Sequence, residues 1–380
     1  MSTASLPPIK LIKTQKDLRG LVKKLSRESL LAIDTESNSL YAYQEQVCLI
    51  QISTRRDDYI IDPLCVTDLQ PLASLMADER IEKVFHAAEY DVITMKRDFG
   101  YEFINIFDTM MAARILGMPE VGLGNLLKHF FNVNNDKRHQ RDNWGARPLS
   151  KDSLHYAQKD THFLPKMRDI LNNMLAKQGR LQEAMETFQD VTLIEAPERP
   201  AFDPNGYWKL GIPNRLTSAQ MKVLRELYKM RDDYARQKNR PAFKIIGNKT
   251  LILLAQHAPR RMAQLHTIHG MTKPQIRRYG DSILEAVECG RASQTLPEPP
   301  RHTPPASEVT DRYAALHAWR KERAIERGVE SDVIVSKQTL WDLAFKAPDQ
   351  PEKLVTIQGM GPWRRQAYGN EILNVLDGLK

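Results

Sequence analysis

Residues 30–36 read LLAIDTE, an apolar run that ends in two carboxylates. Short apolar runs of the same kind follow at 47–52, 59–61 and 84–85, each bounded by polar or turn residues. Amphipathic stretches with helical spacing lie between and after these runs, at 69–76, 106–116, 123–131 and 150–177. Strands first and then mostly helices predict an α/β sheet domain in the first 200 residues or so.

Asp34 and Glu36 lie on the same face of the predicted strand, because side chains along a strand alternate with a period of two. Two carboxylates beside a hydrophobic core are costly unless a cation neutralises them, and a bound divalent metal would do so. A D-x-E pair alone is more typical of a turn or a surface pair. The pattern therefore becomes specific only with further carboxylates.

Two later segments supply those carboxylates. Residues 84–91 read VFHAAEYD and predict a strand that runs into a helix, with Asp91 in its first turn, where a carboxylate also compensates the helix dipole. Residues 156–160 read YAQKD, and their i, i+4 spacing puts the Tyr156 hydroxyl and the Asp160 carboxylate on one helix face. The alternative for this pair is a tyrosine in the core and an aspartate on the surface.

Composition sets the broad class of the protein. The chain has 380 residues, of which 42% are hydrophobic and 27% charged, which is typical of a globular protein with two or three domains. It contains no run of about 18 apolar residues and no signal-peptide pattern, so we expect a cytoplasmic protein without a membrane partner. Its three scattered cysteines favour neither a disulfide framework nor a cysteine zinc site.

The net charge of +8 is concentrated in one segment. Residues 216–290 carry 14 basic and 6 acidic groups, whereas residues 305–380 carry 11 of each. The basic segment predicts a module that binds a polyanion, and a solvated basic face without a partner is the alternative. Arg277 and Arg278 in this segment are our candidate substrate contacts.

The two segments are copies of one module. Sliding the sequence by 89 positions aligns Arg231 with Arg320 and Gly270 with Gly359, without a gap over about 60 positions. The I-x-G-M loop at each glycine resembles the phosphate-binding turn of helix-hairpin-helix proteins, and a plain helix end is the alternative. We expect the neutral second copy to close the particle or to position it against the catalytic domain.

Breaks rich in proline, glycine and polar residues separate the modules. We predict a catalytic domain at 1–200, a linker at 201–215 and the first helical module at 216–291. A Pro-rich linker at 292–306 and the second module at 307–380 complete the chain.

The joint order of D-x-E, a later Asp after H-A-x-x-Y, and Y-x-x-x-D resembles the three motifs of the DEDD superfamily of 3′-5′ exonucleases. The segments NWGARPLS (143–150) and FDTM (107–110) look like bacterial ribonuclease D, and the repeats are similar to HRDC domains. The resemblance implies a ribonuclease H-like domain, with a mixed sheet flanked by helices, followed by two all-α HRDC bundles. It also implies a 3′-5′ exoribonuclease that releases 5′-mononucleotides from RNA 3′ ends, above all those of tRNA precursors.

Carried over by position, the resemblance assigns four carboxylates to two bound Mg²⁺ or Mn²⁺ ions: Asp34, Glu36, Asp91 and Asp160. It assigns Tyr156 to orienting the attacking water. His86 is a candidate substrate contact, with a buried and satisfied histidine as the alternative. The sequence lacks a P-loop and a complete dinucleotide fingerprint, so we expect no nucleotide cofactor. We also expect a monomer.

Some alternatives stay open at this point. His155 lies five residues before Asp160, the spacing of the histidine subgroup of the superfamily, but the segment at 143–150 favours Tyr156. Glu89 places an extra carboxylate beside Asp91, which leaves the register of that motif open. The alternative functions are a DNA exonuclease in repair and a non-catalytic nucleic-acid adaptor, and the presence of every motif carboxylate argues against the adaptor.

Overall fold

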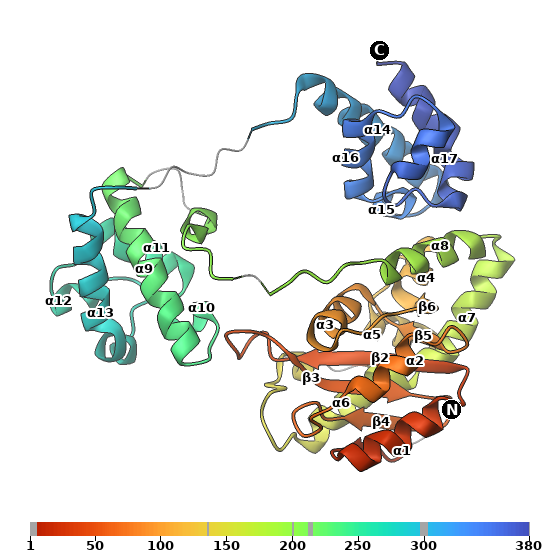
Figure 1. The fold of residues 1–380 in the computed structure, drawn as a ribbon, viewed down its shortest axis with the longest axis horizontal. Helices are drawn as coiled ribbons and strands as arrows, with labels where there is room; N and C mark the ends of the chain where they lie inside the picture. Colours follow the sequence, from red (N-terminus) through yellow and green to blue (C-terminus); the bar gives the residue numbers. More distant parts are fainter. Residues whose placement is uncertain (1–5, 135–136, 200, 212–215, 297–302, 380) are drawn as a thin grey trace. The chain divides into compact units, whose positions relative to one another are not determined.

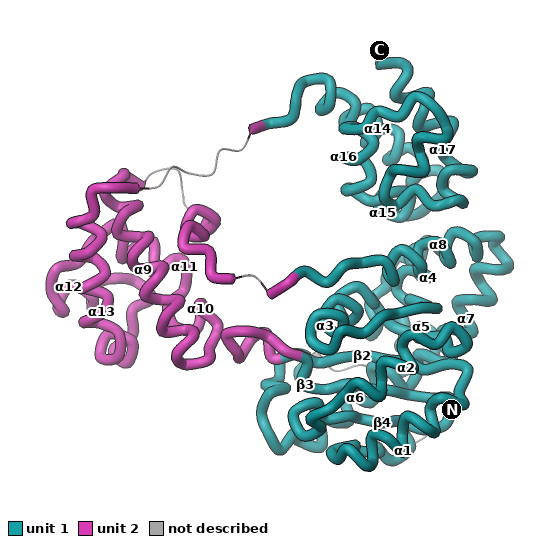
Figure 2. Tube along the Cα trace, in the orientation of Figure 1, with its two compact units in different colours: residues 1–37, 47–197, 304–380 teal, residues 38–46, 198–303 magenta. Residues whose placement is uncertain are grey.

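The computed structural model describes residues 6–134, 137–199, 201–211, 216–296 and 303–379. The chain forms two compact units, one of residues 1–37, 47–197 and 304–380 and the other of residues 38–46 and 198–303 (Figure 2). Parts of both predicted linkers, at 200, 212–215 and 297–302, lie outside the described residues.

Within the described residues, the N-terminal domain, predicted to be catalytic, contains a six-stranded sheet in the order β1-β4-β3-β2-β5-β6 (Figure 1). Strand β2 pairs antiparallel with β3 and parallel with β5, so the sheet is mixed, as predicted. The strands are β1 (Lys10–Ile12), β2 (Leu30–Ser37), β3 (Val47–Ser53), β4 (Asp58–Ile61), β5 (Glu82–Phe85) and β6 (Ile106–Asp108).

Helices cover both faces of this sheet. Ile33 and Ile50 pack into a core with α1 and α3, whereas Ala32 and Leu49 face the other side, where α6 crosses β2, β3 and β4. The helical elements of the domain are α1 (Gln15–Leu25), η1 (Gln70–Leu72), α2 (Ala73–Met76), α3 (Glu89–Phe99), α4 (Thr109–Ile115), α5 (Leu123–Phe131), η2 (Lys137–Arg141), α6 (Lys151–His162), α7 (Leu164–Lys177) and α8 (Leu181–Thr192). The predicted α/β class is confirmed.

Two predicted helices were wrong in extent. The stretch at 150–177 is two helices, α6 and α7, because Pro165 has no N–H and cannot continue a helix without a clash. The stretch at 106–116 begins as strand β6 and becomes helical only after Asp108, whose side chain accepts hydrogen bonds from the N–H groups of Met110 and Met111. Asp108 thus caps α4 and fixes where it begins.

The two repeats have matching elements. Arg231 and Arg320 are both buried, and each donates to a backbone oxygen at 3.1 Å, that of Ile246 or of Val335. The first repeat, preceded by η3 (Gly206–Lys209), consists of α9 (Ser218–Gln237), α10 (Ala242–Ile245), α11 (Asn248–His257), α12 (Met262–Leu265) and α13 (Lys273–Ala292). The second consists of α14 (Ser307–Arg327), α15 (Ser331–Ile334), α16 (Lys337–Lys346), η4 (Pro351–Thr356) and α17 (Pro362–Asp377). Every helix in the described part of the chain is too short or too polar to cross a lipid bilayer.

The glycine of each I-x-G-M loop has a packing reason. Gly270 and Gly359 have φ angles of 89° and 78°, in the left-handed region that favours glycine. A Cβ atom would lie 2.1 Å from the Thr250 hydroxyl oxygen in the first loop and 2.5 Å from that of Thr339 in the second. The conformation and the space explain both glycines without a ligand.

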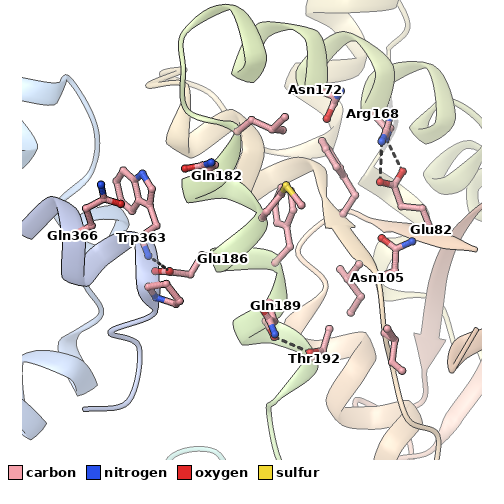
Figure 3. A pocket seen from close by; sticks show the side chains of 17 residues that line it. Glu82, Asn105, Arg168, Asn172, Gln182, Glu186, Gln189, Thr192, Trp363 and Gln366 are labelled. Carbon is pink, nitrogen blue, oxygen red and sulfur yellow. Dashed lines mark hydrogen bonds and ion pairs between the residues drawn. The ribbon is translucent and has the colours of Figure 1, made fainter. Parts of the chain in front are cut away.

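The second repeat packs against α8 of the N-terminal domain within the same unit. The buried Arg364 forms ion pairs with Glu186 at 3.1 Å and Asp190 at 3.2 Å, and Arg327 pairs with the fully buried Glu183. Figure 3 shows Trp363 beside Glu186, at one wall of a groove. The lining of this groove includes none of the motif carboxylates, so it is distinct from the candidate active site.

Candidate active site

Strand β2 and helix α6 bring three motif carboxylates together. Asp34 and Glu36 lie in the half-buried second part of β2, directly after its buried residues, and Asp160 lies on the face of α6 that covers the sheet. One ligand oxygen from each of the three lies within 4.8 Å of the others. Asp160 is buried and the other two residues are half-buried, so solvent reaches the cluster in part.

Asp91 on α3 lies beside this cluster. Its side chain is only 6% exposed, and its Oδ1 accepts a hydrogen bond from the Thr35 hydroxyl at 2.5 Å. Because Thr35 stands between Asp34 and Glu36, this bond ties the start of α3 to the strand that carries the other carboxylates. Glu89, the alternative in this motif, is exposed.

Tyr156 faces the cluster from α6. Its hydroxyl is hydrogen-bonded to Asp160, and its ring packs on the buried Trp144 with the ring centroids 6.2 Å apart. His155, the alternative residue, is exposed. Arg147 holds the segment around Trp144 in place, since it donates to both oxygens of the Asp62 carboxylate at 2.7 Å.

His86 lies at the turn between β5 and α3. The Thr109 hydroxyl donates its single proton to the Phe85 carbonyl oxygen at 2.9 Å, so the contact of 3.0 Å with His86 requires the Nδ1–H of His86 to donate. The neutral ring then has its lone pair on Nε2. Asp108 holds the same turn by accepting hydrogen bonds from the N–H groups of Ala87 and Ala88. The other candidate substrate contacts, Arg277 and Arg278, are exposed on α13 of the first repeat.

Sequence comparison places this chain among known nucleases. A ribonuclease D of Gluconacetobacter diazotrophicus is 31% identical over an alignment of 389 positions, which covers 99% of this chain and 95% of that protein. The chain belongs to the ribonuclease D family. Residues 9–176 match the 3′-5′ exonuclease family, and residues 220–287 and 309–376 each match the HRDC domain.

Solved structures agree with this family. The catalytic core of RRP6 from Trypanosoma brucei is 30% identical, with a TM-score of 0.69 over 78% of this chain and 82% of that one. Escherichia coli RNase D, described as an exoribonuclease involved in structured RNA processing, has a TM-score of 0.67 at 23% identity, over 98% of this chain and 99% of that one, and shares the fold. The chain is therefore a ribonuclease D type 3′-5′ exoribonuclease, an RNA-cleaving hydrolase of a family that depends on divalent metal ions.

The carboxylates of this site repel one another. Burial and the nearby Asp160 raise the pKa of Asp34 well above its ordinary value. Burial, together with Asp34 and Asp160, raises the pKa of Glu36 to about 10. Burial and then Asp34 also raise the pKa of Asp91. Carboxylates held this close require either protons or cations, and an all-oxygen donor set suits hard divalent ions. The residues therefore fit a divalent metal site.

The phenol of Tyr156 stays neutral in this environment. Burial and then the charge of Asp160 raise the pKa of Tyr156 further above its ordinary value. The hydroxyl is therefore a hydrogen-bond donor at physiological pH. Burial acts in the opposite direction on the imidazole and lowers the pKa of His86 to about 4, so His86 is uncharged.

The sequence patterns missed two groups that position the site. Thr35 has an unremarkable place inside the D-x-E motif, and only the fold shows its bond to Asp91. Asp58 on β4 accepts hydrogen bonds from Gln158 and His162, and thereby anchors the part of α6 that carries the predicted site residues. In the sequence, Gln158 and His162 each lie two residues from Asp160. No local signal connects them to Asp58 on β4, about 100 residues earlier.

Proposed function

We propose that this exoribonuclease holds two Mg²⁺ or Mn²⁺ ions and releases 5′-mononucleotides from the 3′ ends of tRNA precursors. The observation that carries the proposal is the cluster of Asp34, Glu36 and Asp160, whose ligand oxygens lie within 4.8 Å of one another under the Tyr156 hydroxyl. Asp91 completes the set of carboxylates.

These four carboxylates would hold the metals. When bound, the ions would lower the pKa of the attacking water and stabilise the charge on the leaving 3′-oxygen. Thr35 fixes the Asp91 carboxylate, and Asp58 fixes the helix that carries Asp160, so the donor atoms are held before the metals arrive.

Tyr156 and His86 act on the reactants from two sides. The neutral Tyr156 hydroxyl, next to Asp160, would hydrogen-bond to the attacking water and orient it. The lone pair on Nε2 of His86 would accept a hydrogen bond from a hydroxyl or amino group of the terminal nucleotide. Because His86 is neutral, it would not compete with the metals by drawing the phosphate toward itself.

The first HRDC repeat would hold the body of the RNA. It carries the whole net charge of the chain, and Arg277 and Arg278 are exposed on it. Phosphate contacts of this kind supply affinity without sequence preference, as a structured precursor would require. The HRDC matches at 220–287 and 309–376 support the domain limits that we predict at 216–291 and 307–380.

A degradation assay tests the proposal. A 5′-labelled tRNA with a 3′ extension, and a DNA of the same sequence, are incubated with Mg²⁺ or Mn²⁺. We expect a ladder that shortens from the 3′ end on the RNA and stops in EDTA. Tyr156→Phe should slow cleavage by about 10²-fold or more, because it removes the group that orients the water.

His155→Ala is the matched control, since this side chain is one residue away and exposed. It should cleave like the wild type. If His155→Ala is inactive and Tyr156→Phe is active, the residue that orients the attacking water is the histidine instead. Equal cleavage of DNA would overturn the RNA specificity.

A further inference from the structure

A row of polar side chains lies on the sheet beneath α6. Ser53 on β3 shares a hydrogen bond of 2.7 Å with Thr161 of that helix. Asp58, its neighbour on β4, accepts hydrogen bonds from Gln158 at 2.7 Å and His162 at 2.8 Å. Each of these buried polar groups thus has a partner on the helix above it.

Gln51 is the next residue of this row, two positions before Ser53 on the same face of β3. It is fully buried, and both its amide nitrogen and its amide oxygen are without a partner among the described residues. A carboxamide has two donors and an acceptor, and burial of such a group without hydrogen bonds costs free energy. In this row Asp58 has a partner for one carboxylate oxygen and none for Oδ1, whereas Gln51 has no partner for either of its polar atoms.

The strand register shows which side chains lie next to Gln51. In the antiparallel register Gln51 stands directly opposite Asp34, so the two side chains share one face with their Cβ atoms about 5 Å apart. Its neighbour on the other side is the apolar Ile60, which offers no hydrogen bond. Of its two cross-strand neighbours only Asp34 is polar, and Asp34 belongs to the carboxylate cluster that includes Asp160.

We propose that Gln51 is a positioning residue of the metal site: its carboxamide holds an ordered water against Asp34 and Asp160, and so fixes the carboxylates for the divalent ion. The proposal rests on the metal site of the proposed function. It explains why a polar group is kept in a strand whose other side chains, apart from the partnered Ser53, are apolar. A carboxamide is neutral, so it orders the site without adding to the repulsion among the carboxylates.

The test measures metal binding and stability separately, without substrate. Gln51→Met keeps the length of the side chain and removes its hydrogen bonds, and Gln51→Leu is a second variant in case the first does not fold. Mn²⁺ affinity is measured by titration calorimetry, and the melting temperature is measured in EDTA. We expect the Mn²⁺ dissociation constant to rise about 10-fold or more, as for other residues that support metal ligands.

We expect the melting temperature in EDTA to stay the same or rise, because the lost carboxamide had no protein partner. Ser53→Ala is the matched control in the same row, and it should lower the melting temperature and leave the Mn²⁺ affinity unchanged, since its partner is Thr161. The opposite signs of the two effects separate a positioning role from a structural one.

Asp34→Asn separates this inference from the proposed function. If Asp34→Asn abolishes Mn²⁺ binding and Gln51→Met and Gln51→Leu bind Mn²⁺ like the wild type, the role of Gln51 is wrong and the metal site stands. If the Gln51 variants lower the melting temperature in EDTA as Ser53→Ala does, Gln51 has a structural partner and the inference is also wrong. Undiminished Mn²⁺ binding by Asp34→Asn would overturn the metal site itself.

Discussion

The Glu186 carboxylate of α8 accepts a hydrogen bond from the backbone N–H of Trp363 at 2.6 Å, and it thereby caps the last helix of the second repeat. The N–H of Arg364 donates to the same carboxylate at 3.2 Å. In the first repeat the cap is supplied by Thr272, whose position matches Gly361, 89 residues later. A Cβ atom at Gly361 would lie 2.1 Å from the Glu186 carboxyl carbon. The last helix of the second repeat thus has no capping side chain of its own, and the glycine leaves room for a capping carboxylate from the catalytic domain.

Arg364→Met tests how firmly this contact holds the second repeat. Arg364 and Glu186 are 7% and 8% exposed, and the substitution leaves a buried carboxylate without its main counter-ion. Breaking such a pair costs about 3–5 kcal/mol, so we expect the free energy of unfolding in urea to fall by about 3 kcal/mol.

Arg365→Met is the control for this experiment. The neighbouring guanidinium donates to the Met360 carbonyl oxygen at 2.7 Å, and the loss of one such bond costs about 1 kcal/mol. Equal losses for the two variants would mean that the buried pair does not stabilise the contact with α8.

Asp34→Asn should stabilise the metal-free protein and remove its response to metal. The neutral amide relieves the burial and the repulsion by Asp160 that raise the pKa of Asp34, so the melting temperature in EDTA should rise by about 2–4 °C for a gain of about 1 kcal/mol. Added Mn²⁺ should raise the melting temperature of the wild type and not that of Asp34→Asn. Asp152→Asn, an exposed carboxylate on α6, should behave like the wild type in both conditions. A lower melting temperature of Asp34→Asn in EDTA would contradict the repulsion argument.

The fold and the motif carboxylates were accessible to sequence reasoning because their signals are local. Apolar runs mark β2 and β3, the D-x-E spacing puts Asp34 and Glu36 on one face, and the repeat is visible as identical residues 89 positions apart. The helix at 123–131 was predicted with the bounds of α5, since its apolar spacing is regular throughout. These features need no knowledge of distant parts of the chain.

The features that the sequence did not reveal depend on distant residues. Gln51 sits in an apolar run, and only the strand register puts it opposite Asp34. Glu186 reads as one of several acidic residues on an amphipathic helix, and its burial follows from a repeat about 180 residues later. Nothing near Asp58 in the sequence indicates that it anchors α6. Such contacts are set by tertiary packing, which local patterns do not encode.

His86 should make the stability of the protein depend on pH in mildly acidic solution. Burial lowers its pKa to about 4 in the folded chain, whereas an unfolded histidine titrates at about 6.5. Between these values the unfolded chain holds a proton that the folded chain lacks, so this group lowers the free energy of unfolding as the pH falls from about 6.5 toward 4. The contribution is present above about pH 6.5 and is lost below that pH.

Urea unfolding of the wild type and His86→Gln at several pH values isolates this contribution, because glutamine cannot titrate. We expect the stability advantage of the wild type over His86→Gln to shrink by about 1–3 kcal/mol between pH 7 and pH 4.5. His155→Gln is the control, since folding leaves its side chain exposed. If the free energies of unfolding of the wild type and His86→Gln differ by a constant amount over this range, folding does not bury the imidazole.

The last prediction concerns how the two repeats share the binding of RNA. Arg277 and Arg278 are exposed on α13, and the matching positions of the second repeat, 89 residues later, are Gln366 and Ala367. The double variant Arg277→Gln, Arg278→Ala therefore gives the first repeat the residues of the second, which are compatible with this helix. If both arginines contact phosphates, the slope of log Kd against log salt should fall by about 1.4 for single-stranded RNA, because each lost contact removes about 0.7. Binding is measured with an inactive Asp34→Asn background in EDTA, so that cleavage does not interfere.

The pair Lys321→Gln, Lys337→Gln, two exposed cations of the neutral repeat, is the control and should leave the slope unchanged. Both double variants remove the same charge from the chain, so a smaller slope in both would mean that RNA binding depends only on the total charge. A smaller slope in the control alone would mean that the RNA phosphates contact the second repeat.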